Sequence, residues 1–166
     1  MHAEHGSVYI EAPVFGRPEA AVAQQLWIPV AGSQIAKERV QLLLKAMGAQ
    51  GTFDFGEEVG TATLVKIAGN FLISSAVRSL GEALAMAEKN GVDPKAVVDM
   101  LTQTLFPAPI YQSYGKMIAE KTVTFSLSAI PLKDIGLFKE TAQRVGSPTP
   151  IASVLEDLLR SNQGRV

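Results

Sequence analysis

The sequence predicts a mainly helical protein with a small α/β part at its N-terminal end. Two observations lead to this prediction. Up to about residue 57, short runs of β-branched and aromatic residues alternate with glycines and prolines, a pattern typical of strands and turns. Beyond about residue 57, apolar residues recur at three- and four-residue spacing, which is the period of amphipathic helices. With 47% hydrophobic residues among 166, the chain has enough apolar material for a sizeable core.

The N-terminal part is predicted to contain three strands and one helix. The strands cover residues 8–14, 26–31 and 52–55, and the helix covers about 34–47. Ser33 is a suitable N-cap for this helix, and Gly48 ends it. Because Pro29 has no amide hydrogen, the second strand is expected at a sheet edge or at a bulge. The order strand, strand, helix, strand suits part of a mixed sheet, and because such sheets normally have more strands, we expect this one to be incomplete.

The rest of the chain is predicted to be helical. The predicted helices cover about 57–90, 93–104, 110–120 and 131–145, with an irregular link over 121–129 and a last helix from residue 150. Asn90-Gly91 is a suitable end for the long first helix, and Asp93-Pro94 is a suitable start for the next. We therefore expect a first domain over residues 1–57 and an all-helical domain over 58–166, which the chain enters through the long helix.

Composition argues against several classes of function. The chain has no Cys, and its two His lie within the first five residues, so neither a metal site nor thiol or His catalysis is expected. The net charge of −1 gives no electrostatic reason to bind nucleic acid or an anionic membrane. No signal peptide is visible, and the most apolar stretch, residues 63–77, is shorter than the roughly 20 apolar residues that span a bilayer. We expect a cytoplasmic protein.

The first segment suited to chemistry lies in the predicted long helix. Lys66 and Asn70 are four residues apart and share one helical face with the small residues Ala62 and Gly69. Small residues leave room for a ligand against the helix, and a Lys among apolar neighbours can act as a general acid or base. The same spacing also suits a Lys whose ammonium group reaches solvent from a mostly buried helix.

Two further segments are less specific on their own. Lys133-Asp134 lies at a predicted helix start, where an acidic residue is favoured by roughly 0.3–1 kcal/mol through the helix dipole, so Asp134 needs no functional explanation. Phe15-Gly16-Arg17 follows a predicted strand, and turns at strand ends often contact substrates. An ordinary loop explains this turn as well.

In their order and rough spacing, these segments resemble the β-hydroxyacid dehydrogenases, the family of 3-hydroxyisobutyrate dehydrogenase, which is related to 6-phosphogluconate dehydrogenase. The resemblance covers nearly the whole chain, and the ordered set is more specific than any single motif. The matching segments are Glu11-Ala12-Pro13-Val14, residues 26–32, Gly60 with Lys66 and Asn70, Glu82-Ala83-Leu84-Ala85, Asn90-Gly91-Val92-Asp93-Pro94 and Lys133-Asp134-Ile135.

The resemblance implies an oxidoreductase that uses NAD or NADP to transfer hydride to or from a small hydroxy acid or related carbonyl compound. It also implies that residues 1–57 are the last part of a Rossmann domain, and that residues 58–166 resemble the helical C-terminal domain of 6-phosphogluconate dehydrogenase. Carried over residue by residue, Lys66 is the catalytic acid or base and Asn70 helps to hold the substrate. Lys133 lies beside the cofactor, with Asp134 as its orienting neighbour.

The sequence departs from the family pattern at three places. The family's substrate-binding Ser is Phe15, and the Gly that should follow Gly16 is Arg17, a candidate ligand for an anionic substrate. Ala62 and Gly69 replace a Gly and an Asn of the family pattern, which are mild changes. No Gly-x-Gly-x-x-Gly fingerprint follows a strand anywhere. We therefore expect a C-terminal fragment without the Rossmann core, which is inactive alone and binds no dinucleotide tightly.

Other functions remain compatible with the sequence. One is a non-catalytic helical dimerisation module, and another is an imine or semialdehyde reductase of the same fold, with which Phe15 is compatible. Both NAD and NADP remain possible, because the residue that selects between them belongs to the absent core. Helices that would otherwise pack on that core are expected to pair with a second chain, so a homodimer through the helical domain is expected.

Overall fold

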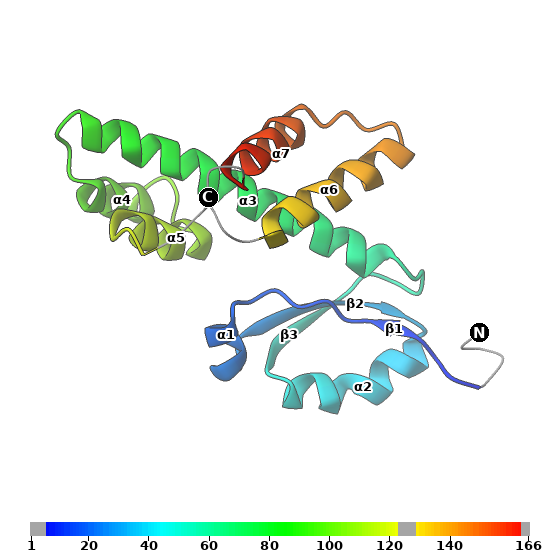
Figure 1. Cartoon of the computed structure of the whole chain (residues 1–166). Coiled ribbons are helices and arrows are strands. Elements are labelled where there is room, and N and C mark those ends of the chain that lie inside the picture. Colours follow the sequence, from blue (N-terminus) through cyan, green and yellow to red (C-terminus); the bar gives the residue numbers. More distant parts are fainter. Residues whose placement is uncertain (1–5, 123–128, 164–166) are drawn as a thin grey trace. The chain divides into compact units, whose positions relative to one another are not determined.

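The computed structural model describes residues 6–122 and 129–163, and the internal contacts divide the chain into two units, Met1–Ala68 and Gly69–Val166 (Figure 1). The fold is mainly helical with a three-stranded sheet near the N-terminus, as the sequence predicts. The elements in chain order are β1 (Ile10–Glu11), α1 (Pro18–Val22), β2 (Leu26–Gly32), α2 (Gln34–Ala46), β3 (Ala49–Asp54), α3 (Thr61–Lys89), α4 (Pro94–Gln103), α5 (Pro109–Ala119), α6 (Ala129–Arg144) and α7 (Pro150–Gln163).

The sheet of the first unit is mixed, with order β1-β2-β3. β1 is antiparallel to β2, and β3 is parallel to it. β2 is therefore the central strand, so the edge position that Pro29 suggests is wrong. The alternative expectation is a bulge, and the pairing of β2 with β3 does contain a register shift, between Leu26 and Trp27. Pro29 fits the central strand because the antiparallel partner is interrupted opposite it. β1 pairs with Ala31 and Gly32, and an isolated bridge joins Phe15 to Trp27, so none of the described residues is a ladder partner of Pro29 on that side.

The core of the first unit lies between the sheet and α2 (Figure 1). Ile28 of β2 is fully buried and packs in one cluster with Leu44 of α2. Ser33 caps α2 as predicted, because its Oγ accepts the amide hydrogen of residue 36. Lys37 of α2 is also buried, and its Nζ lies 2.6 Å and 2.7 Å from the two carboxylate oxygens of Asp54. This ion pair joins α2 to the end of β3.

Several element boundaries differ from the predicted ones. β1 is limited to Ile10–Glu11, although residues 8–14 favour a strand, because only these two residues pair with β2. The short helix α1 was not expected; it begins with a proline in its first turn. β3 begins at residue 49 instead of 52, and α6 begins at residue 129 instead of 131. Residues 123–128 of the predicted irregular link lie outside the described residues.

In the second unit, α4 pairs with α5, and α6 pairs with α7 (Figure 1). Leu80 and Leu84 of α3 form a buried cluster with Val98 of α4. Ile135 of α6 belongs to a second cluster, which includes side chains of α7. None of the helices in residues 6–122 and 129–163 combines the length and the hydropathy that a bilayer-spanning segment requires.

Candidate functional site

A carboxylate from the sheet caps the N-terminus of α3. Glu11 is buried in β1, and its Oε2 accepts the amide hydrogens of Gly60, at 2.8 Å, and Thr63, at 3.5 Å. Its Oε1 accepts the hydroxyl hydrogen of Thr63 at 2.9 Å. The first amides of a helix have no acceptor within the helix, and the helix dipole favours negative charge there. The cap therefore holds the start of α3 against the sheet.

The side chain of Lys66 lies over the ring of Phe15. Its Nζ is 4.4 Å from the ring centroid, within the range of a cation–π contact, and both residues are half-buried. The backbone of Phe15 is fixed by two hydrogen bonds with Trp27, with N–O distances of 2.8 Å and 3.0 Å. The structure thus brings together two predicted site residues, one from the strand-end turn and one from the long helix.

The other two residues of that turn have different surroundings. Gly16 has a φ of +149°, and a Cβ there would lie 2.5 Å from the Leu26 side chain, so a larger residue does not fit without a shift. Arg17 precedes α1, and its Nε lies 3.4 Å from the Glu19 carboxylate. This pair is exposed on both sides. A role for Arg17 in binding an anionic substrate stays a prediction.

In the second unit, Asp134 contacts two other predicted site residues. Asn70 Nδ2 donates a hydrogen bond of 2.8 Å to Asp134 Oδ2, and Lys133 Nζ lies 3.3 Å from Asp134 Oδ1. The side chain of Asp134 is 14% exposed, whereas that of Lys133 is 66% exposed. The carboxylate therefore holds the Asn70 amide in one orientation, while the Lys133 ammonium group remains open to a ligand.

The helix dipole does not explain Asp134, so that expectation is wrong. α6 begins at Ala129, and its first turn contains no acidic residue. The carboxylate lies further along the helix, where its hydrogen bond to Asn70 accounts for it instead. A helix start at Pro131 would place Asp134 in the first turn, but the helix begins two residues earlier, at Ala129.

Glu11, which caps α3, is a structural residue near the site that the sequence did not indicate. It appears in the matching segments only as a neighbour of Ala12 and Pro13, and its partners lie 49 and 52 residues later in the chain. No local pattern links a strand carboxylate to a helix start so far away. By contrast, Lys66 and Asn70 lie one turn apart on α3, as their spacing predicts. Lys66 contacts the ring of Phe15 in the first unit, and Asn70 donates a hydrogen bond to Asp134 in the second unit.

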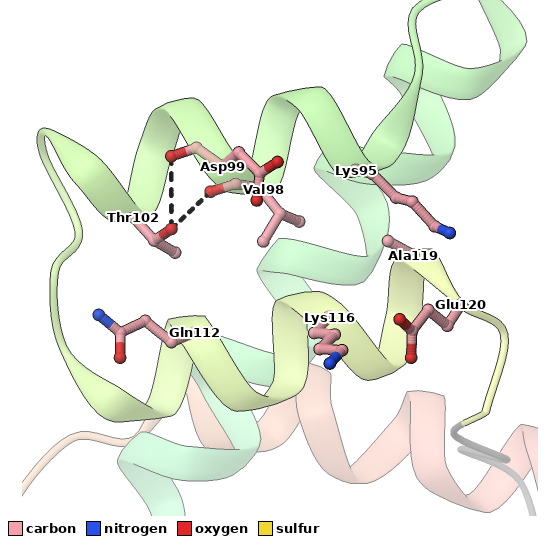
Figure 2. Close-up of a pocket in the computed structure, with 8 residues that line it drawn as sticks. All are labelled: Lys95, Val98, Asp99, Thr102, Gln112, Lys116, Ala119 and Glu120. Carbon is pink, nitrogen blue, oxygen red and sulfur yellow. Dashed lines mark hydrogen bonds between the residues drawn. The ribbon is translucent and has the colours of Figure 1, made fainter.

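A polar cavity of about 370 Å³ lies between α4 and α5 and contains none of the predicted site residues (Figure 2). Its lining carries two ammonium groups, Lys95 and Lys116, and two carboxylates, Asp99 and Glu120, so it has no net charge to attract one class of ion. Thr102 Oγ1 already donates its hydrogen to carbonyl oxygens of its own helix (Figure 2). We therefore do not assign the reaction to this cavity.

A family model described as NAD-binding of NADP-dependent 3-hydroxyisobutyrate dehydrogenase matches residues 60–165. The chain is 38% identical over 163 residues to the uncharacterised oxidoreductase YfjR of Bacillus subtilis, covering 96% of this chain and 56% of that protein. It is 30% identical over 159 residues to glyoxylate/succinic semialdehyde reductase 2 of Arabidopsis thaliana, covering 93% and 43%. It is 30% identical over 151 residues to L-threonate dehydrogenase of Haemophilus influenzae, covering 90% and 50%. The chain spans about half the length of these relatives.

Solved structures show the same fold. The chain matches 3-hydroxyisobutyrate dehydrogenase from Salmonella typhimurium with a TM-score of 0.83 and 22% identity, over 96% of this chain and 56% of that one. It matches a Mycobacterium tuberculosis 3-hydroxyisobutyrate dehydrogenase with L-serine, with a TM-score of 0.77 and 22% identity, over 98% and 58%. It matches Psf3 in complex with NADP+ and 2-OPP with a TM-score of 0.79 and 22% identity, over 96% and 56%.

Proposed function

Because the chain belongs to the 3-hydroxyisobutyrate dehydrogenase family of NAD(P)-dependent oxidoreductases, we propose that it carries the substrate side of such an enzyme. The reaction transfers hydride between a nicotinamide and a small hydroxy acid or related carbonyl compound. The observation that carries this proposal is the placement of Lys66 and Asn70 one turn apart on α3, each held by a contact of its own.

Lys66 is the proposed acid or base. When a carbonyl is reduced, its oxygen gains negative charge and must receive a proton, and the Lys66 ammonium group is suited to donate it. When a hydroxyl is oxidised, the neutral amine of Lys66 takes the hydroxyl proton. Asn70 holds the substrate through its amide, whose orientation is fixed by the hydrogen bond to Asp134.

Lys133 is the residue proposed to contact the cofactor. The nicotinamide of that cofactor supplies or accepts the hydride. The Lys133 ammonium group is largely exposed, so it is open to a phosphate or another anionic group. The Gly-x-Gly-x-x-Gly fingerprint that holds the pyrophosphate in a Rossmann domain does not occur in this sequence, so these residues are not proposed to form a pyrophosphate cradle. Both NAD and NADP are compatible with this arrangement.

Reduction of a semialdehyde or a related carbonyl compound is a second candidate function. Phe15 is compatible with it, because an apolar ring stands where the resemblance implies a substrate-binding hydroxyl. The Arabidopsis thaliana relative, which is named as a glyoxylate/succinic semialdehyde reductase, favours it. A panel of hydroxy acids, semialdehydes and imines, assayed with the complete gene product and both nicotinamide cofactors, separates the candidates. Turnover of none of them would favour a non-catalytic dimerisation module.

A homodimer through the helical part belongs to the same proposal. Apolar side chains of α3 and α7 are exposed around a cavity of about 580 Å³ in the second unit, among them Leu72, Ile151 and Val154. Contiguous exposed apolar surface of this kind is unusual on a monomer. A second copy of the chain, which presents the same surface, would cover it by a self-complementary contact.

A further inference from the structure

The contact between Lys66 and Phe15 joins two segments that are each fixed independently. Phe15 is held by its paired backbone hydrogen bonds to Trp27, at 2.8 Å and 3.0 Å. The start of α3, one turn before Lys66, is held by the carboxylate of Glu11. The ring and the helix therefore have little freedom relative to each other within the first unit. Within this arrangement, Lys66 Nζ lies 4.4 Å from the ring centroid.

A lysine ammonium group is carried on a flexible four-carbon stem and can take many positions. The face of an aromatic ring attracts a cation because of the ring's quadrupole, and an aliphatic side chain of similar volume does not. A ring with a fixed backbone therefore restricts the ammonium group to the space over its face. Proton transfer depends on such restriction, because small displacements of a reacting group lower the rate steeply.

We propose that Phe15 is a positioning residue for Lys66: its ring holds the ammonium group at the place where it meets the substrate oxygen. This inference rests on the proposed role of Lys66 as acid or base. It assigns to the aromatic ring a role that the hydroxyl implied by the resemblance does not have, since a hydroxyl offers no π face. The substrate oxygen then lies on the side of the ammonium group that faces away from the ring.

If Phe15 had only a space-filling role in the fold, its variants would behave differently from those of a positioning residue. If the ring only fills space beside β2, then Phe15→Leu, which keeps most of the apolar volume, should leave the reaction unchanged. If the ring positions Lys66, Phe15→Leu should impair the reaction while Phe15→Tyr, which keeps the π face, should restore it. Phe53→Leu is the matched control, because Phe53 is an aromatic residue of the same sheet whose described ring contact is with Trp27.

The kinetic test uses the complete gene product with a substrate found in the panel. We expect Phe15→Leu to lower kcat by roughly 2- to 30-fold, the range that corresponds to a cation–π contact, with little change in the substrate KM. We expect Phe15→Tyr and Phe53→Leu to keep most of the activity. An unchanged kcat in Phe15→Leu, or an equal loss in Phe15→Tyr, would overturn the inference.

A spectroscopic test does not depend on turnover. Protons over the face of an aromatic ring experience its ring current, so the Lys66 ε-methylene signal of protein labelled with carbon-13 lysine should be shifted upfield. The signal is assigned by its loss in Lys66→Arg. We expect Phe15→Leu to abolish the shift and Phe53→Leu to keep it; a normal Lys66 signal in the unaltered protein would overturn the inference.

The two tests separate this inference from the proposed function. If Lys66→Met removes activity while Phe15→Leu does not, the inference fails and the proposed function stands. If Lys66→Met keeps full activity, the proposed function fails, and the inference fails with it even where the ring-current shift is present.

Discussion

The side-chain amide of Asn70 donates a 2.8 Å hydrogen bond to the carboxylate of Asp134, a residue 64 positions later in the chain. One carboxylate thereby orients the proposed substrate-binding residue of α3 and pairs with Lys133, the proposed cofactor-binding residue of α6. The loss of this carboxylate should affect substrate binding more than folding, because Asp134 is not part of either buried cluster of the second unit.

The first prediction concerns Asp134→Ala in the complete gene product. Without the carboxylate, the Asn70 amide loses its fixed orientation, and a hydrogen bond to a charged group contributes about 1.5–3 kcal/mol, so kcat/KM should fall by roughly tenfold or more. Lys133→Ala is the comparison: it should raise the KM of the cofactor and leave the KM of the substrate close to that of the unaltered protein. If Asp134→Ala and Lys133→Ala changed the KM of the substrate and the KM of the cofactor equally, separate roles for the two residues would be contradicted.

The second prediction concerns the contact between α4 and α5. A Cβ at Gly115 would lie 2.8 Å from Cγ1 of the buried Val98, so Gly115→Ala overpacks this contact. Overpacking a core costs about 1–3 kcal/mol, which corresponds to a Tm several degrees lower. Gly81→Ala in α3 is the control, because a Cβ there meets nothing within 4 Å and alanine favours a helix. Calorimetry should show opposite Tm changes for the two variants.

The third prediction concerns the acid stability of the helical unit. Hydrogen bonds from Lys139, at 2.6 Å, and from Arg160 lower the pKa of Glu156 below its ordinary value. A carboxyl group whose pKa is lowered on folding contributes stability above its unfolded pKa, and this contribution is lost as the pH falls through the lowered folded pKa.

Glu156→Gln should therefore lower the free energy of unfolding at neutral pH. In acid, the free energies of unfolding of the variant and the unaltered protein should lie closer together. Urea denaturation at several pH values measures this dependence. The neighbouring Asp157→Asn serves as the control, because Asp157 is exposed and should change the stability little at any pH. If the free energy of unfolding of Glu156→Gln differed from that of the unaltered protein by the same amount down to strongly acidic pH, the assigned ion pairs would be contradicted.

The fourth prediction concerns oligomeric state. If α3 and α7 form the surface between two copies, light scattering should give the mass of a dimer for the unaltered chain. Leu72→Asp combined with Val154→Asp should give a monomer, since charges would then be buried in an apolar contact. Val145→Asp, which alters another highly exposed apolar residue, should remain a dimer. A monodisperse monomer for the unaltered chain would remove this part of the proposal.

The parts of the fold that depend on local patterns are predictable from the sequence. The spacing of apolar residues indicates the long helix α3, and the i, i+4 rule places Lys66 and Asn70 on one face of it. Ser33 is recognisable as an N-cap because its acceptor role involves only the next three residues. The family resemblance depends on the order of such local motifs.

The parts that depend on distant partners are not predictable in this way. Glu11 caps a helix that begins 49 residues later, and Asp134 bonds to a residue 64 positions earlier. Pro29 suggests an edge strand or a bulge because a proline cannot donate to a ladder, yet it lies in the central strand, opposite an interruption of the antiparallel partner. In each case tertiary pairing, which no local window contains, determines the result.

The central claim is that Lys66 transfers the proton during hydride transfer, and the kcat of Lys66→Met in the complete gene product tests it most directly. Removal of a general acid or base lowers the rate by about 10²- to 10⁴-fold, and we expect a loss of that size with cofactor binding preserved. Lys95→Met, which alters an exposed lysine of α4, should keep full activity. A Lys66→Met protein with the kcat of the unaltered enzyme would contradict the account.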